Sequence, residues 1–362
     1  MRTILVAALV LTASLVVPFA AGARSADACA GLIGSNGAVN LGRTTTLAAY
    51  HDGVEHYVTA FEFQGGGGEF GTLIPLPDVP SNVERGGDWT LQRLQLETAP
   101  PDAFAAAEDS AGAQLRGADV LFEVRIDALD ITVLKGGGPD VATWAQEHGF
   151  RLSPDAPEVL DFYAQRSPIF LAAVFDGEAA AGRGQQIGDG TPVHLTIPTD
   201  DPWVPLRILG LGKQSEDFVQ ADVFLLTDKQ PTILPAPDND FSGGVIREPI
   251  GLFLTHDAPA TDLLLDDLRS DAGMGWIPED AWLTKLQIDA SAGQLSYDLA
   301  IDPTGTGEPS RVDAGLDIIA SIDIPTVPDD SGTSLTWPWL AAAAALAAGF
   351  VGLRRLAPAR DR

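Results

Sequence analysis

The sequence predicts an α+β fold: a strand-rich exported domain of one or two lobes with a few short helices, followed by one C-terminal transmembrane helix. Three observations predict it. Short runs rich in β-branched and aromatic residues outnumber the helix-type runs by about three to one and do not alternate strictly with them. The N-terminal apolar stretch is typical of a signal peptide, and the C-terminal one is typical of a membrane span. Residues 29–334, between those ends, suffice for one large or two medium domains.

The N-terminus has the organisation of a secretory signal peptide. Met1-Arg2-Thr3 precedes an apolar run from Ile4 to Val17. Two Ala-x-Ala cleavage motifs follow, Ala21-Gly22-Ala23 and Ala26-Asp27-Ala28. We therefore assign residues 1–28 to a signal peptide and expect export. A retained membrane anchor is the alternative interpretation.

The C-terminus has the organisation of a single membrane span. The segment 335–353 contains no charge, and its nineteen residues would extend about 28 Å as a helix, close to the thickness of a bilayer core. Arginines in the 354–362 tail orient that tail toward the cytoplasm. Residues 327–334 have the composition of a linker. The alternative is a sorting tail that is removed after export.

The composition excludes several classes of partner. The chain carries 22 basic against 50 acidic residues, a net charge of −28, with a pI near 4.2. Nucleic-acid binding depends on clustered positive charge, so we expect no nucleic-acid partner. The single cysteine, Cys29, rules out an internal disulfide. The expected partners are the membrane, through the C-terminal helix, and a ligand of the envelope or the cell exterior.

The clearest local element is a hairpin over Thr44–Phe63, in which two strand-type runs flank the turn dipeptide Asp52-Gly53. Three helices are predicted. The first follows Gly136-Gly137-Gly138 with Pro139 in its first turn. The second begins at a capping box formed by Asp155 and Glu158, and the third spans Thr261–Arg269. The other predicted strands are Glu69–Leu76, Leu129–Leu134, Ile169–Phe175, Val193–Ile197, Val204–Leu209, Val219–Leu226, Trp282–Ile288, Leu295–Ile301 and Leu316–Ile324.

Several long segments together resemble one bacterial family. They include ACAGLIGSNGAVNLGRTTTLAAYHDGVEHYVTAFEF, FGTLIPLP, VERGGDWTLQRL, RIDALDITVLKGGG and HLTIPTDDPWVPLRILGLG. The chain resembles, in its actinobacterial form, a family of exported proteins classified only as a domain of unknown function. The family's usual opening is Ala-Cys-Gly-Gly, and Ala30 replaces the first of those glycines here. The resemblance implies a signal peptide, an extracytoplasmic domain and often a C-terminal helix, and it implies no reaction.

The best candidate ligand site is an acidic loop beginning at Asp238. Asp238, Asp240 and Ser242 stand at positions 1, 3 and 5 of a calcium-loop pattern, followed by the turn glycine Gly243. Position 12 is Pro249 instead of glutamate, so a complete EF-hand is not predicted. A solvated acidic turn is the preferred interpretation, and calcium held by these three residues is the best ligand hypothesis.

Histidines suggest a second site. If Asp52-Gly53 forms a two-residue turn, His51 lies opposite Val54 and His56 opposite Ala49, which places both imidazoles on one sheet face. A metal would need a third ligand that the sequence does not identify, so a solvated hairpin tip is the preferred interpretation. His194 lies in an apolar run and is expected to be a core or edge residue.

No catalytic motif of the serine-hydrolase, zinc-protease or Ser-x-x-Lys type occurs, which leaves the question of an enzyme open but favours a non-enzyme. Trp203, between two prolines, is interpreted as a core residue, with an exposed stacking platform as the alternative. The predicted function is a binding or structural module anchored in the cell envelope and supported by calcium. The alternative function is a surface hydrolase that acts through carboxylates or histidine.

Overall fold

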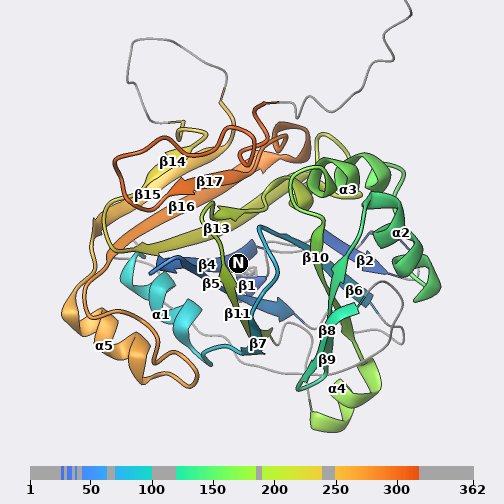
Figure 1. The fold of residues 1–362 in the computed structure, drawn as a ribbon. Coiled ribbons are helices and arrows are strands. Elements are labelled where there is room, and N and C mark those ends of the chain that lie inside the picture. The colour runs from blue at the N-terminus through green and yellow to red at the C-terminus, as the bar shows by residue number, and fades with distance from the viewer. Residues whose placement is uncertain are drawn as a thin grey trace, which may run out of the picture. The chain divides into compact units, whose positions relative to one another are not determined.

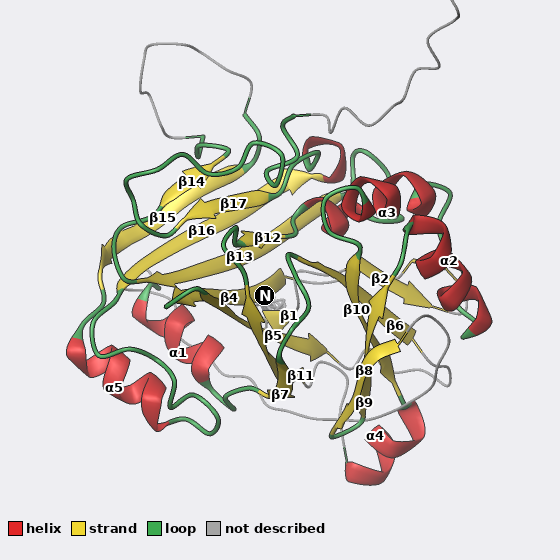
Figure 2. Cartoon of the chain, in the orientation of Figure 1, coloured by secondary structure: helices red, strands yellow, loops and turns green. Residues whose placement is uncertain are grey.

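The computed structural model describes residues 26–27, 31–34, 37–38, 43–62, 70–99, 120–184, 190–238 and 249–317. Within these ranges the fold is strand-rich α+β with few helices, as predicted (Figure 2). The chain divides into one unit of residues 1–319 and a second of residues 320–362, and all of the second lies outside the described residues.

The largest sheet has the strand order β15-β16-β13-β4-β5-β11-β7, with β1 paired to β4 (Figure 1). Neighbouring strands are antiparallel except for β13 with β4 and β1 with β4. The strands are β1 (Ala26–Asp27), β4 (Arg43–His51), β5 (Val54–Glu62), β7 (Asn82–Arg85), β11 (Gly190–Pro198), β13 (Phe218–Thr227), β15 (Leu252–Pro259) and β16 (Trp282–Ser291).

Two smaller sheets complete the strands. One has the order β3-β2-β6-β10-β9-β8, and the other has the order β12-β17-β14. Their strands are β2 (Gly31–Gly34), β3 (Gly37–Ala38), β6 (Phe70–Leu76), β8 (Val120–Ile126), β9 (Leu129–Lys135), β10 (Ile169–Phe175), β12 (Trp203–Val204), β14 (Thr232–Leu234) and β17 (Leu299–Asp302).

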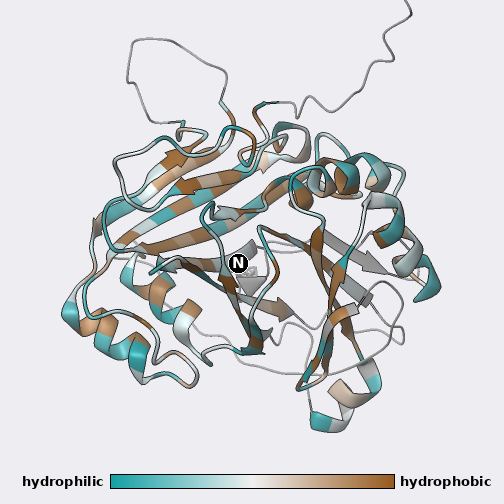
Figure 3. Cartoon of the chain, in the orientation of Figure 1, coloured by the Kyte–Doolittle hydropathy of each residue, from teal (hydrophilic) through white to brown (hydrophobic). Residues whose placement is uncertain are grey.

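Side-chain alternation along the strands divides the core into layers. One apolar cluster joins residues such as Tyr57 and Leu195 of the large sheet to Ile131 and Leu171 of the six-stranded sheet, so these sheets share a buried face. Figure 3 shows the apolar colour concentrated on the strands. This shared core leaves the opposite face of each sheet to be covered by helices.

The helices cover those outer faces. The α-helices are α1 (Thr90–Glu97), α2 (Gly138–Glu147), α3 (Ala156–Ala164), α4 (Gly177–Arg183) and α5 (Asp262–Ser270), with 3-10 turns at Arg207–Gly210 and Ala292–Gln294. Leucines of α1 and α5 pack on Leu47 and Val58 of the large sheet. Helices α2 and α3 pack on Leu73 and Phe170 of the six-stranded sheet. The face under α1 and α5 carries the site described below.

Two helix starts confirm the local signals in the sequence. At α2, the Asp140 carboxylate accepts a hydrogen bond from the Gly137 amide at 2.8 Å, and Pro139 lies in the first turn. At α5, the Thr261 hydroxyl accepts from the Leu264 amide at 3.2 Å. Both caps satisfy amides that a helix N-terminus leaves without partners.

The predicted capping box at α3 is wrong. The helix does start after Asp155, but that carboxylate accepts a hydrogen bond from the Gly212 amide at 3.0 Å and caps no helical amide. Glu158 instead pairs with Arg207 at 2.5 Å. Both acids therefore hold the segment after β12 against α3, a long-range role that the local spacing does not reveal.

The predicted strand Val204–Leu209 is also largely wrong. Only Trp203–Val204 pairs with another strand, and the chain then turns into the 3-10 turn Arg207–Gly210. The amides of Leu206 and Arg207 donate to the Asp298 carboxylate, at 2.7 and 2.9 Å, instead of to a strand. The buried Asp298 side chain thus accepts the hydrogen bonds that a neighbouring strand would accept in a sheet.

No helix among the described ranges is long and apolar enough to cross a membrane. The predicted span 335–353, with its linker 327–334 and tail 354–362, lies outside those ranges, as do residues 1–25 of the predicted signal peptide and Cys29. Residues 318–324 of the last predicted strand lie outside them too.

Candidate functional site

The hairpin prediction is confirmed, and it brings His56 to an unexpected partner. Ala49 faces His56 and His51 faces Val54 across the β4–β5 pair, which is the predicted register. On the other side of β5, His194 of β11 faces Val58, so it is the diagonal neighbour of His56 on the same sheet face. The Nδ1 of His56 lies 2.9 Å from the Nε2 of His194, in hydrogen-bond geometry.

Glu84 extends this line to a third strand. On β7 it lies directly opposite His194, and its Oε1 is 3.3 Å from the His194 Nδ1. This contact does not have hydrogen-bond geometry, but a negative charge at this distance favours a proton over a lone pair on the His194 Nδ1. The Nε2 of His194 is then an acceptor, and His56 must carry its own proton on Nδ1 to donate to it. One carboxylate thereby sets the tautomer of both rings.

Trp276 covers the pair. It lies in the segment between α5 and β16, and its indole stacks on the His56 ring with centroids 3.9 Å apart and planes 4° apart. The same indole lies 5.0 Å from the His194 centroid. The neighbouring side chains Met274 and Ile277 are buried among the leucines of α1 and α5, which fixes this segment to the sheet.

Burial keeps both imidazoles neutral. The side chain of His194 is only 1% exposed, and desolvation lowers its pKa from 6.5 to about 4. Desolvation also lowers the pKa of His56 to about 4, and the nearby His194 and His51 add to that effect. Glu84 opposes the shift at His56 without reversing it. Both rings therefore offer lone pairs well below neutral pH.

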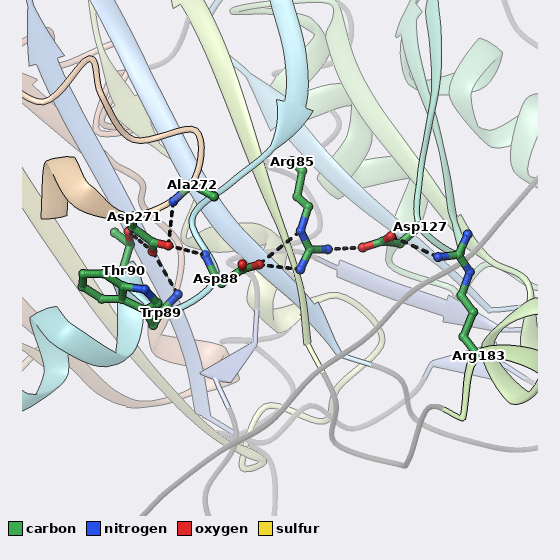
Figure 4. A network of polar contacts seen from close by, with 8 residues as sticks. All are labelled: Arg85, Asp88, Trp89, Thr90, Asp127, Arg183, Asp271 and Ala272. Carbon is green, nitrogen blue, oxygen red and sulfur yellow. Dashed lines mark hydrogen bonds and ion pairs between the residues drawn. The ribbon is translucent and has the colours of Figure 1, made fainter.

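A polar network joins the segment after α5, the start of α1 and the end of β7 (Figure 4). The Asp271 carboxylate accepts hydrogen bonds from the Asp88 and Trp89 amides, at 3.1 and 2.9 Å, and from the Thr90 hydroxyl at 2.8 Å. It joins the start of the Trp276 segment to the N-terminus of α1. The N-terminal end of that helix carries a partial positive charge, which favours a carboxylate there.

The same network fixes β7. Arg85, next to Glu84 in the sequence, donates to Asp88 at 2.6 Å and also pairs with Asp127. Asp127 in turn accepts from Arg183 of α4 at 3.1 Å. Asp127 lies in the β8–β9 turn, where its φ is +56°. Because this turn joins two strands of the six-stranded sheet, the network reaches that sheet. Glu84 and Trp276 are thus positioned by side chains from both sheets.

Comparison with known proteins gives a family. A family model described as "Uncharacterized protein conserved in bacteria (DUF2330)" matches residues 23–299, more than half of the chain. The chain belongs to this family. No curated protein matches it. The resemblance inferred from the sequence segments is confirmed to that extent.

Among solved structures, this member of the DUF2330 family is similar to baculovirus P35. A mutated baculovirus P35 after caspase cleavage, at 3.1 Å resolution, is 10% identical with a TM-score of 0.40, over 73% of this chain and 98% of that chain. Baculovirus P35 itself is 8% identical with a TM-score of 0.37, over 72% and 96%. Similarity at this level carries no information about activity.

The predicted calcium loop is described only at its start. Asp238 accepts hydrogen bonds from the amides of Ile250, Gly251 and Leu252, at 2.8, 2.7 and 3.2 Å. Asp240 and Ser242 lie outside the described residues. No group of three or more His, Cys, Asp or Glu side chains that could share a metal ion occurs in the ranges that the structure describes.

A buried acid lies on the opposite face of the histidine strand. Glu55 is fully buried, and desolvation raises its pKa from 4.5 to about 8. The Trp203 backbone opposes that shift only partly. At neutral pH the Glu55 carboxyl is mostly protonated.

The other predicted positions take structural roles. Trp203 is 2% exposed, which confirms its interpretation as a core residue. His51 pairs with Asp228 at 2.6 Å, away from His56. The sequence missed the partnership of His56 with His194 because 138 residues separate them. The available signal was the position of His194 in an apolar run, which indicated burial but not its partner.

Proposed function

We propose that this protein is a non-enzymatic binding or structural module of the cell envelope. In this proposal residues 1–28 direct export, residues 29–326 form the extracytoplasmic domain, and the helix 335–353 anchors it with the 354–362 tail in the cytoplasm. The apolar C-terminal run and its flanking arginines support the anchor and its orientation.

The observation that carries the proposal is that several carboxylates hold backbone amides of distant segments. Asp271 holds the start of α1, and Asp298 accepts from the amides of Leu206 and Arg207 while pairing with Arg166 at 2.6 Å. The partly buried Asp238 accepts from three successive amides at the start of β15. A hydrolase that acts through carboxylates needs acids that converge on a cleft. These acids instead fasten distant segments, as a rigid binding scaffold requires.

Protease accessibility tests the proposed topology. In intact cells from which the outer wall has been removed, an added protease should degrade the domain and spare an epitope placed after Arg362. Detergent should expose the epitope to the same protease. A domain that resists digestion until the membrane is opened, although the purified protein is cleaved, would contradict the export that this function requires.

Calcium is the proposed ligand of Asp238, Asp240 and Ser242. A ligand that binds only the folded state adds about 2.7 kcal/mol at one hundred times its dissociation constant. The full-length chain in detergent is first treated with a chelator. Its melting temperature should then rise on addition of millimolar calcium and stay unchanged with magnesium. Asp240→Ala should abolish the rise. Identical melting with and without calcium would rule this ligand out.

The alternative is a surface hydrolase, and one observation favours it: Glu84, His194 and His56 form a line from a carboxylate through two imidazoles. Such a line can relay a proton. However, a histidine with a pKa of about 4 is a weak base at neutral pH, which places the hydrolase second. Turnover of an ester, phosphoester or glycoside substrate that disappears in His56→Gln would reverse this order.

A further inference from the structure

The facing nitrogens of His56 and His194 have a linear arrangement. The two ring centroids are 5.1 Å apart, and the nitrogens between them are 2.9 Å apart. Because a ring nitrogen lies about 1.15 Å from its centroid, these distances place both nitrogens close to the line that joins the rings. The donor direction of one ring and the lone pair of the other therefore meet head to head.

This geometry selects among metal ions. Zinc in proteins takes four ligands in a tetrahedron, and calcium takes six to eight oxygens. Two imidazoles that face each other along one line offer neither arrangement. They match a soft monovalent ion with a filled d shell, which accepts two nitrogen ligands at 180°, and imidazole is a ligand that suits copper.

Trp276 adds a second feature that fits a cation. Its indole centroid is 3.9 Å from the His56 centroid and 5.0 Å from that of His194. Together with the separation of the two rings, these distances place the indole about 4 Å from the midpoint between them, inside the ~6 Å range of cation–π attraction. An ion between the two nitrogens would lie against an aromatic face.

Glu84 supplies the support that metal-binding histidines usually have. A histidine ligand commonly directs its other ring nitrogen at a carboxylate, which fixes the ring and raises its basicity. Glu84 lies near that place beside His194, with its Oε1 3.3 Å from Nδ1 but outside hydrogen-bond geometry, so it supports the ring by its charge. The carboxylate is 47% exposed, so it is a positioning residue and not a buried charge.

We propose that His56 and His194 bind one monovalent copper ion between the His56 Nδ1 and the His194 Nε2, beneath Trp276. This inference rests on the proposed binding function and names its ligand. Metal–nitrogen bonds of about 2 Å require the nitrogens to separate to about 4 Å, so the rings move apart by about 1 Å. The His56 proton moves from Nδ1 to Nε2, both rings stay neutral, and copper enters and stays monovalent, so no electron is transferred.

The test uses the full-length chain in detergent with Cys29→Ser, which removes the only thiol. Anaerobic Cu⁺ is titrated against a chromogenic chelator, and Ag⁺ serves as a monovalent ion that does not change oxidation state. We expect one ion per chain and at least a tenfold loss of affinity in His56→Gln and in His194→Gln. Glu84→Gln should weaken binding by about tenfold, because outer partners of metal ligands typically matter by that much.

A matched control exists on α2. His148 also stacks on a tryptophan, with its ring 4.1 Å from that of Trp144, but its Nδ1 lies 2.8 Å from the Trp144 carbonyl oxygen. His148→Gln should therefore leave Cu⁺ and Ag⁺ affinity unchanged. A far-UV spectrum and melting temperature for each variant identify any loss that comes from unfolding. If His194→Gln unfolds, His56→Gln on the less deeply buried ring decides the result.

Histidine NMR gives a readout that a purely structural pair would not change. On addition of Ag⁺, the His56 proton should transfer from Nδ1 to Nε2 while His194 keeps its proton on Nδ1. The proposal is overturned if no ion binds, if His56→Gln binds equally well, or if zinc binds the pair as tightly as Ag⁺. If protease accessibility gives the proposed topology but the chain binds no copper, this ligand is rejected and the proposed envelope function is retained.

Discussion

The Asp271 carboxylate accepts a hydrogen bond from the Trp89 amide at 2.9 Å, although 182 residues separate the two positions. Trp89 is the N-cap residue of α1 and has no side chain that can cap the helix. A residue that follows α5 therefore supplies the cap of α1. This contact also anchors the segment that carries Trp276 over the histidine pair.

Removing that cap should destabilise the fold. Asp271→Ala leaves three amides, those of Asp88, Trp89 and Ala272, and the Thr90 hydroxyl without their acceptor, so we expect a loss of about 2–4 kcal/mol in the free energy of unfolding. Urea unfolding measures it. Asp280→Ala, an exposed acid in the same segment, is the control and should change nothing. Equal stabilities for the two variants would show that the cap contributes little.

Gly87 should tolerate no side chain. A Cβ there would overlap the Thr90 hydroxyl, the Asp271 carboxylate and Met274. We expect Gly87→Ala to cost about 1–3 kcal/mol by overpacking this junction. At Gly275, a Cβ would meet nothing within 4 Å, so Gly275→Ala should be neutral or slightly stabilising. Comparing the two melting temperatures checks the packing, and a neutral Gly87→Ala would contradict it.

Breaking the buried ion pair of Asp298 and Arg166 should lower the free energy of unfolding more than breaking an exposed pair. Their side chains are 0% and 3% exposed, and Tyr163 also donates to Asp298 at 2.8 Å. Asp298→Asn leaves the Arg166 charge without its counter-ion, so we expect a loss of about 3–5 kcal/mol. Asp317→Asn, which breaks the exposed pair with Arg311, is the matched control and should have no measurable effect. Chemical unfolding of both variants decides whether burial makes the difference.

The sequence predicts elements whose signals are local. The β4–β5 hairpin follows from Asp52-Gly53, and α5 follows from the Thr261 cap and its leucines. Helix α1 was not predicted, because its cap is Asp271 and no local residue marks its start. The line of Glu84, His194 and His56 was not predicted for the same reason. The pairing of β5 with β11 joins segments that no short sequence pattern connects.

Glu55 should make stability depend on pH above the acid range. Its pKa is 4.5 when exposed and about 8 in the fold, so the unfolded chain ionises first as pH rises. The stability that Glu55 contributes is complete below pH 4.5, falls as pH rises, and is lost above the folded pKa of about 8. Glu55→Gln stays neutral and should escape this decline.

Urea unfolding at pH 5, 7 and 9 measures that effect. Relative to the parent, Glu55→Gln should be nearly equal in stability at pH 5 and more stable at pH 9, by on the order of a few kcal/mol. The exposed Glu279→Gln is the control and should follow the parent at every pH. A constant difference between Glu55→Gln and the parent would show that Glu55 does not carry the titration.

The central claim is that Glu84 fixes a neutral His194–His56 pair as a ligand site, and histidine NMR of the metal-free chain tests it most directly. With histidine ¹⁵N labels, both rings should be neutral at pH 6 and carry their protons on Nδ1, since both pKa values lie at about 4. Glu84→Gln should remove the preference at His194. A proton on the His194 Nε2, or charged rings at pH 6, would contradict the account.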